Sequence, residues 1–271
     1  MRHSELAGRF LQLHRAGAPL LMPNAWDVGS AVLFASLGFD ALATTSGGFA
    51  ATKGRLDGSM SRDEVLVHAR ELVGAVDLPL SADLENCFAH DPGRVADTIT
   101  AAIGTGLAGG SVEDFTRDPD APIYELAHAA DRVRAAAEAA HSGPSTLVLT
   151  ARAENYIHGR PDLADTITRL QAYQEAGADV LFAPKLVDSA ELRQLLGSVD
   201  LPVSVLAMPG APPVGELAEL GVSRISVGGA ITLAAYGAAV TAATELRDGG
   251  TYGYRELSDV GGLAVRAAFG H

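Results

Sequence analysis

The amino-acid sequence predicts a (β/α)8 barrel, an α/β fold in which eight parallel strands alternate with helices. Two observations predict it: short apolar stretches recur along the whole chain, and each is followed by a segment with helical periodicity. A doubly wound open sheet is the alternative, but no G-x-G-x-x-G motif follows the first strand. The predicted strands lie near residues 19–22, 40–45, 78–82, 107–112, 145–150, 179–183, 202–206 and 223–227.

The predicted helices carry start and end signals at the expected places. Residues 4–16 form an amphipathic pattern ahead of the first strand. Ser61 and Glu64 have the spacing of a capping box, in which each side chain bonds the backbone of the other residue at the start of a helix. Gly38 and Gly177 each follow a predicted helix, where glycine readily adopts the left-handed conformation that ends it.

Length and composition limit the possible functions. A chain of 271 residues has the size of a single barrel, so we expect one domain over residues 1–271, with residues 250–271 as a C-terminal extension. The net charge of −13 argues against binding to nucleic acid or to anionic membranes, which attract clustered Lys and Arg. The lone cysteine, Cys87, excludes an internal disulfide. Because the N-terminus also lacks an apolar targeting segment, we expect a cytoplasmic protein.

Acidic side chains follow several predicted strands at the point where each strand ends. In a barrel these ends face one mouth, where active sites form. Asp83 and Glu85 follow the third strand, and they point the same way if the strand continues through both. An ionised carboxylate cannot be buried without a cation or hydrogen-bond donors. With Asp57 and Glu113 from neighbouring elements, they form a predicted acidic ring, which we interpret as a divalent-metal site.

Two further strand ends carry candidate groups for binding a substrate carboxylate. Ser46, Gly47 and Gly48 follow the second strand and could offer a hydroxyl and successive backbone N–H groups, although an ordinary turn has the same composition. Arg152 follows an apolar strand and needs an anion, either a substrate carboxylate or Glu113 in a structural ion pair. Both alternatives for Arg152 stay open at the level of sequence.

Other polar residues at the strand ends leave the reaction class open. Lys185 follows the sixth strand and would suit a Schiff-base aldolase, the alternative enzyme class. Glu154, Tyr156 and His158 are candidates for moving a proton, and the sequence does not distinguish among them. Cys87 has no basic neighbour in the sequence and is interpreted as an unreactive thiol. A barrel that binds carboxylates without turnover is a third possibility.

Six segments, in order over roughly residues 18–240, resemble the isocitrate lyase/phosphoenolpyruvate mutase superfamily. The segments are Pro23-Asn24-Ala25-Trp26-Asp27 with Ser30-Ala31, Thr45-Ser46-Gly47-Gly48, Gly54-x-x-Asp57, Ala82-Asp83, Ser111-Val112-Glu113-Asp114 and Ala151-Arg152-x-Glu154. The resemblance implies a (β/α)8 barrel, usually tetrameric, whose final helix is exchanged between subunits. It also implies reactions that pass through an enolate-like oxyanion, which a bound Mg²⁺ stabilises.

The resemblance assigns roles to individual residues of this sequence. The residues that it assigns to Mg²⁺, largely through water, are Asp57, Asp83 and Glu113. The residues that it assigns to the carboxylate end of a 2-oxo acid are Ser46, Gly47, Gly48 and Arg152. From the acidic ring and the resemblance together we expect catalytic roles for Arg152, Glu113 and Asp57, with Glu85 as an additional metal ligand.

The sequence departs from the family pattern at three places. The paired Asp-x-Asp of the family reads Ser81-x-Asp83 here, and Glu85 is the candidate replacement. The Lys-(Lys/Arg)-Cys-Gly-His loop of the lyases is absent, and the loop after Asp114 lacks the lysine and asparagine of the mutases. We therefore predict a Mg²⁺-dependent lyase for a small 2-oxo or 2-hydroxy dicarboxylate. The alternatives are a P–C bond mutase or hydrolase of the phosphonopyruvate type and the Lys185 aldolase.

Overall fold

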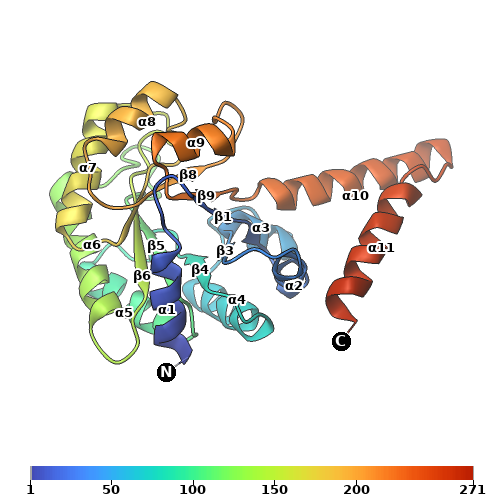
Figure 1. Ribbon diagram of the computed structural model, residues 1–271, viewed down its shortest axis with the longest axis horizontal. Coiled ribbons are helices and arrows are strands. Elements are labelled where there is room, and N and C mark those ends of the chain that lie inside the picture. The colour runs from blue at the N-terminus through green and yellow to red at the C-terminus, as the bar shows by residue number, and fades with distance from the viewer. Residues whose placement is uncertain (1, 271) are drawn as a thin grey trace.

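The computed structural model of the chain describes residues 2–270, and its strands form one parallel sheet that curves into a barrel (Figure 1). The strands are β1 (Leu20–Met22), β2 (Asn24–Ala25), β3 (Leu42–Thr44), β4 (Leu80–Asp83), β5 (Gly109–Glu113), β6 (Val148–Arg152), β7 (Val180–Phe182), β8 (Val203–Leu206) and β9 (Arg224–Ser226). Every pairing in the sheet is parallel, and from β2 to β9 neighbours along the barrel are also neighbours along the chain. The predicted barrel is confirmed.

The first predicted strand is split into β1 and β2, and this split closes the barrel. β1 pairs with β9, whereas β2 pairs with β3 on the other side. Pro23 lies between them and has no N–H to donate, but its carbonyl accepts a hydrogen bond from the Ala43 amide at 3.0 Å. The first strand therefore joins both sides of the sheet although proline interrupts it.

Helices surround the barrel and begin where the sequence signals them. Ser61 and Glu64 form the predicted capping box, with Ser61 N donating to Glu64 Oε2 at 2.9 Å. The helices are α1 (Arg2–Gln12), α2 (Val28–Ser36), α3 (Ser46–Thr52), α4 (Arg62–Ala75), α5 (Pro92–Ile103), α6 (Leu126–His141), α7 (Leu163–Glu175), α8 (Ser189–Leu196), α9 (Val214–Leu220), α10 (Ala230–Gly249) and α11 (Arg255–Phe269).

Helix α1 covers the N-terminal end of the barrel. Phe10 is fully buried and packs among the apolar side chains at this end, including Leu20, Val148 and Val180. A Cβ atom on Gly109 would lie 2.5 Å from the Phe10 ring, so glycine at this position of β5 is what admits the ring. Because this end is filled, a functional site in the bore can open only at the carboxyl ends of the strands.

Directly after α1, a buried histidine contacts a buried arginine inside the barrel. His14 Nδ1 donates to the Phe10 carbonyl at 2.9 Å, which leaves Nε2 to accept from Arg224 Nη1 at 3.4 Å. Burial, followed by the charge of Arg224, lowers the pKa of His14 to about 3. The folded protein therefore holds His14 neutral.

Acid is expected to destabilise the protein through His14. The pKa of His14 in the folded protein lies below the ordinary histidine value of 6.5. The stability that the neutral His14 contributes is therefore complete above pH 6.5 and is lost as the pH falls toward 3. At pH 5 the free energy of unfolding should be lower by on the order of 2 kcal/mol through this group. Urea denaturation of wild type and His14→Gln at pH 7 and pH 5 measures it, since the stability difference between the two proteins should shrink by that amount. A constant difference contradicts the assignment.

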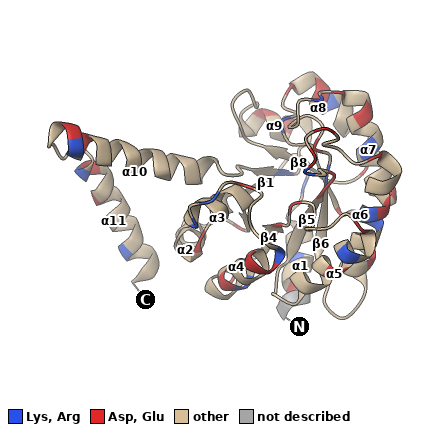
Figure 2. Cartoon of the chain, turned by 180° about the vertical axis from the view of Figure 1, so that it is seen from behind, with Lys and Arg blue, Asp and Glu red and all other residues tan. Residues whose placement is uncertain are grey.

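Helices α10 and α11 project from the barrel, and α11 folds back to contact α2 (Figure 1). Helix α10 carries no charged residue before Glu245, as Figure 2 shows along most of its length. Its apolar side chains are largely exposed to solvent, with Leu233 at 68% and Val240 at 66% exposure. The projection thus begins at α10, ahead of the predicted extension. None of the helices within residues 2–270 combines the length and apolar character needed to cross a membrane.

Candidate active site

The carboxyl ends of the strands surround a cavity of about 540 Å³, and the predicted acidic ring lines it. Ser46 and Arg152 line the same cavity, so the structure gathers side chains that are more than a hundred residues apart in sequence. The predicted site residues on its wall are Ser46, Asp57, Asp83, Glu85, Glu113 and Arg152. Gly47 and Gly48 do not occur among the described lining residues.

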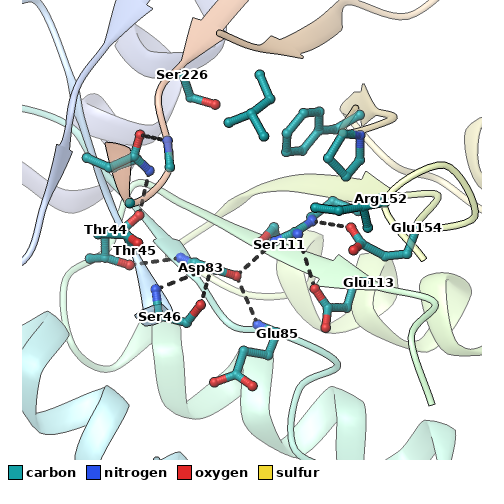
Figure 3. Close-up of a pocket in the computed structure, with 18 of the residues that line it drawn as sticks. Thr44, Thr45, Ser46, Asp83, Glu85, Ser111, Glu113, Arg152, Glu154 and Ser226 are labelled. Carbon is teal, nitrogen blue, oxygen red and sulfur yellow. Dashed lines mark hydrogen bonds and ion pairs between the residues drawn. The ribbon is translucent and has the colours of Figure 1, made fainter. Parts of the chain in front are cut away.

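Arg152 is the centre of the charged cluster, because three carboxylates converge on its guanidinium group (Figure 3). Its Nη1 lies 2.9 Å from Asp83 Oδ1, and its Nη2 lies 3.2 Å from Glu113 Oε2. Its Nε donates to Glu154 Oε1 at 2.8 Å. Of the two alternatives for Arg152, the ion pair with Glu113 is therefore present.

Asp83 also joins the second and third units of the barrel. Its Oδ2 accepts from the Ser46 hydroxyl at 2.9 Å and from the Ser46 amide at 3.4 Å. Its own amide donates to Thr44 Oγ1 at 2.9 Å (Figure 3). The carboxylate is thus held from both sides, by Ser46 and by Arg152, and has little freedom to rotate.

The segment Ser46–Gly48 forms the first turn of α3, not a free loop. Thr45 caps this helix, and its hydroxyl accepts from the Gly48 amide at 3.2 Å. A Cβ atom on Gly48 would lie 2.5 Å from Thr45 Cγ2 and 2.7 Å from Thr232 Oγ1, so close packing requires glycine there. The Gly48 N–H is therefore occupied, and its predicted contact with a substrate carboxylate has no geometric support.

Glu85 does not continue the strand, because β4 ends at Asp83 and the Glu85 backbone is left-handed with φ 51°. The condition for Asp83 and Glu85 to share a strand face is therefore not met, although both carboxylates line the cavity. Arg117, on the loop after β5, pairs with Glu85 Oε2 and donates to the Gly58 carbonyl at 3.1 Å. The other oxygen of Glu85, Oε1, is buried and has no hydrogen-bond partner.

Burial raises the pKa values of three acidic side chains that line the cavity, and neighbouring carboxylates add to the effect. Burial, followed by the charge of Asp83, raises the pKa of Glu85 to about 7. Burial also raises the pKa of Glu154 to about 6 and that of Glu113 well above its usual value, despite Arg152 beside both. Their ionised forms would be stabilised by an added positive charge.

The donor set fits a hydrated Mg²⁺ ion. All four predicted ligands offer carboxylate oxygens, the donors that this ion prefers, and Glu85 Oε1 lacks a partner. Within residues 2–270, however, no three His, Cys, Asp or Glu side chains converge as a set of direct ligands. The guanidinium of Arg152 lies between Asp83 and Glu113 instead. Binding through retained water molecules, which Mg²⁺ favours, suits this arrangement.

The structure separates the remaining candidates by their position. Glu154 and His158 line the cavity, whereas Tyr156 does not occur among the described lining residues. Lys185 is exposed at the surface and is likewise not among those lining residues, which gives the Schiff-base aldolase no geometric support. Cys87 is completely buried, and burial raises its pKa to about 12, as expected for an unreactive thiol.

Two arginines of the cavity were not predicted from the sequence. Arg117 reaches the site from a loop, and nothing in its local sequence indicates where that loop folds. Arg224 does carry a signal, because it lies within the short apolar stretch Val222–Val227. An arginine inside a barrel strand must point either to the helices or into the bore, and Arg224 lines the cavity.

A parallel barrel with charged side chains gathered at the carboxyl ends of its strands is the architecture of a (β/α)8-barrel enzyme. The sequence pattern of the phosphoenolpyruvate phosphomutase family matches residues 10–247. The chain therefore belongs to the isocitrate lyase/phosphoenolpyruvate mutase superfamily, as its motifs indicate.

Similar proteins cover most of the chain. A crystal structure of a candidate lyase/mutase from Burkholderia cenocepacia has a TM-score of 0.91 and 47% identity, covering 94% of this chain and 92% of that one. An uncharacterized protein of Mycobacterium tuberculosis is 33% identical over 241 residues, or 89% of each chain. The 2-methylisocitrate lyase of Bacillus subtilis is 31% identical over 209 residues, or 73% of this chain and 66% of the lyase.

Proposed function

We propose that this chain is a cytoplasmic, Mg²⁺-dependent lyase that cleaves a C–C bond in, or decarboxylates, a small 2-oxo or 2-hydroxy dicarboxylate. The observation that supports it most is the convergence of Asp83, Glu113 and Glu154 on Arg152 within the cavity. The similarity to 2-methylisocitrate lyase supports the same class of reaction.

The proposed metal site consists of Asp57, Asp83, Glu85 and Glu113. Mg²⁺ held there, largely through water, would supply positive charge to stabilise the oxyanion that develops as the bond breaks. Arg152 fixes the orientation of these carboxylates before substrate binds, because its guanidinium contacts two of them directly. Such preorganisation keeps the site from rearranging during the reaction.

His158 and Glu154 are the proposed proton-transfer pair. The His158 ring is stacked on Phe115 with 3.8 Å between ring centroids, so its orientation is fixed. Burial and the charge of Arg152 lower the pKa of His158, which keeps the imidazole neutral near pH 7 and able to accept a proton. Its Nε2 lies 3.7 Å from Glu154 Oε2, and this carboxylate would stabilise the protonated ring.

A panel of 2-oxo and 2-hydroxy dicarboxylates, followed by NMR for pyruvate, glyoxylate or loss of CO₂, tests the proposal. Activity is expected to disappear with EDTA and to return with Mg²⁺. Direct titration of the EDTA-treated protein with Mg²⁺ supplies a second readout, because filling the site should raise Tm in a concentration-dependent way. Turnover that EDTA does not affect contradicts the metal requirement.

Two further assays separate the alternative reactions. Conversion of phosphonopyruvate, seen by ³¹P NMR, would identify a P–C bond mutase or hydrolase instead of a C–C lyase. Borohydride trapping of a 2-oxo acid on Lys185 would identify the Schiff-base aldolase. If carboxylates bind but none is turned over, the chain is a carboxylate-binding protein and not an enzyme.

We also propose that further copies of the chain cover α10 and α11 in a homotetramer. Both helices expose large apolar side chains, such as Leu233 at 68% on α10 and Leu263 at 64% on α11. Exposed apolar surface of this kind marks an interface. Sedimentation velocity should give about four times the chain mass of 27.9 kDa, and Leu233→Asp with Val240→Asp should reduce it. A monomeric wild type contradicts the proposal.

A further inference from the structure

The cavity continues from the mouth into the bore, because the side chains at its inner end are small. In most (β/α)8 barrels, bulky branched residues fill this space. Here Ala43, Ser81 and Ser111 line the cavity from β3, β4 and β5, and Ser226 lines it from β9. Arg224, two residues before Ser226, also lines it. At about 3.3 Å per residue, the Arg224 backbone lies roughly 6–7 Å deeper in the bore than Ser226.

Arg224 is buried, with 4% of its surface exposed, and its partners are uncharged. Its Nε donates to Ser204 Oγ at 2.9 Å, and its Nη1 donates to Thr150 Oγ1 at 3.1 Å. Nη1 also lies 3.4 Å from the Nε2 of His14, which is held neutral. Among the described residues, none accepts a hydrogen bond from Nη2, and no carboxylate forms an ion pair with Arg224.

The other two arginines of the cavity already have carboxylate partners. Arg152 is bound by Asp83, Glu113 and Glu154. Arg117 is bound by Glu85. Within the described part of the chain, Arg224 is thus the lining arginine whose charge no carboxylate compensates. A buried guanidinium without a counter-charge is costly, and an anion that reaches it would recover part of that cost.

We propose that Arg224 is the inner anion-binding residue of the cavity and receives one carboxylate group of a dicarboxylate ligand, whose other end lies at the charged mouth. The inference rests on the proposed function for the class of ligand. It deepens that function by assigning the selection of dicarboxylates over monocarboxylates to the bore.

The bore suits a carboxylate in both charge and shape. The Arg224 Nη2 group keeps its donors for a carboxylate, since Nε and Nη1 are occupied by Ser204, Thr150 and His14. The side chains of Ser81, Ser111 and Ser226 place further hydroxyl groups on the same wall. Burial and the nearby charge of Arg152 lower the pKa of Arg224 to about 9, so repulsion between the two cations favours an anion between them. Ser204 and Thr150 hold the Arg224 side chain in place before a ligand binds.

Succinate and succinamate, its monoamide, form a matched pair of ligands of similar shape that differ by one negative charge. Isothermal titration calorimetry with the full chain and saturating Mg²⁺ gives Kd for both without requiring turnover. Wild type is expected to bind succinate at least about tenfold more tightly, as one charge-assisted hydrogen-bonded contact predicts. In Arg224→Gln, this ratio of the two Kd values should fall to near one, whereas Arg224→Lys should retain part of it.

Two further variants keep the test decisive. Ala43→Leu fills the inner end of the bore but keeps Arg224, so the ratio of the two Kd values should again fall to near one. This variant serves as the test if Arg224→Gln does not fold. Arg134→Gln removes an exposed cation on α6 and should leave the ratio unchanged. A ratio near one in wild type, or an undiminished ratio in folded Arg224→Gln or in Ala43→Leu, overturns the proposal. If wild type cleaves a dicarboxylate but binds succinate and succinamate equally well, only the proposal for Arg224 is wrong. If wild type neither binds nor turns over dicarboxylates, the proposed function is wrong as well.

Discussion

Replacement of Asp83 by asparagine is expected to lower kcat/KM by about 10²–10³-fold or more, the usual effect of losing one preorganised electrostatic contact. Asparagine keeps the shape of the side chain but removes the charge that pairs with Arg152. It also replaces one acceptor oxygen by an amide group, which disturbs the bonds from Ser46 and Glu85. Both losses act on the predicted metal site, so Mg²⁺ affinity should fall together with activity.

Steady-state kinetics and Mg²⁺ titration of the same Asp83→Asn preparation measure the two effects. Ser46→Ala is the matched comparison, because it removes one hydrogen bond to Asp83 but leaves the carboxylate charged. It should lose activity by about tenfold or less, the effect of one neutral hydrogen bond. If Asp83→Asn keeps wild-type activity and Mg²⁺ affinity, Asp83 is not a metal ligand.

Replacement of Arg152 by methionine is expected to cost about 3–5 kcal/mol of the free energy of unfolding, the usual result of leaving buried charges unpaired. The variant retains Asp83, Glu113 and Glu154 around an apolar side chain, and the two glutamates are buried. Without the guanidinium, the pKa values of Glu113 and Glu154 should rise further above their usual range.

The decrease in the free energy of unfolding of Arg152→Met should depend on pH. A carboxyl group with a raised folded pKa stabilises the protein below its unfolded pKa, and this contribution is lost as the pH rises through the folded pKa. The variant should therefore be closest to wild type near pH 5 and furthest from it near pH 8. Urea denaturation at both values measures this, and adding Glu154→Gln should restore part of the stability at pH 8.

The control for this prediction is Arg134→Met, which breaks an exposed ion pair with Asp131. Exposed pairs contribute about 0–1 kcal/mol, so this variant should remain close to wild type at both pH values. If Arg152→Met is no less stable than Arg134→Met, the cluster is not held together by its arginine.

The barrel and the location of the site follow from local sequence patterns. Buried parallel strands must be apolar on both faces, which makes stretches such as Val148–Arg152 visible in the sequence. The end of each apolar stretch then locates the mouth, and for this reason Asp83 and Glu113 could be predicted as neighbours. Arg152 could be predicted at the same site. Whether it pairs with Glu113 or stays free for a substrate carboxylate depends on distances that the sequence does not contain.

The details that the sequence did not reveal depend on contacts between distant segments. Ser46–Gly48 has the composition of a turn, yet Thr45 caps it into a helix that packs against Thr232 of α10. Glu85 takes a left-handed backbone conformation that local propensity disfavours for a glutamate. Arg117 meets Glu85 across 32 residues of sequence, and no periodic pattern relates positions on two such loops.

The Phe10 ring that fills the base of the barrel has a kinetic consequence. Because the bore is closed at its base, ligands enter and leave only through the mouth. The reaction product that lies deeper in the bore can therefore leave only after the outer product has left. If bond cleavage divides a molecule lying along this axis, its two halves leave in a fixed sequence. Product-inhibition patterns would then be those of ordered release, with the inner fragment as the last product to leave.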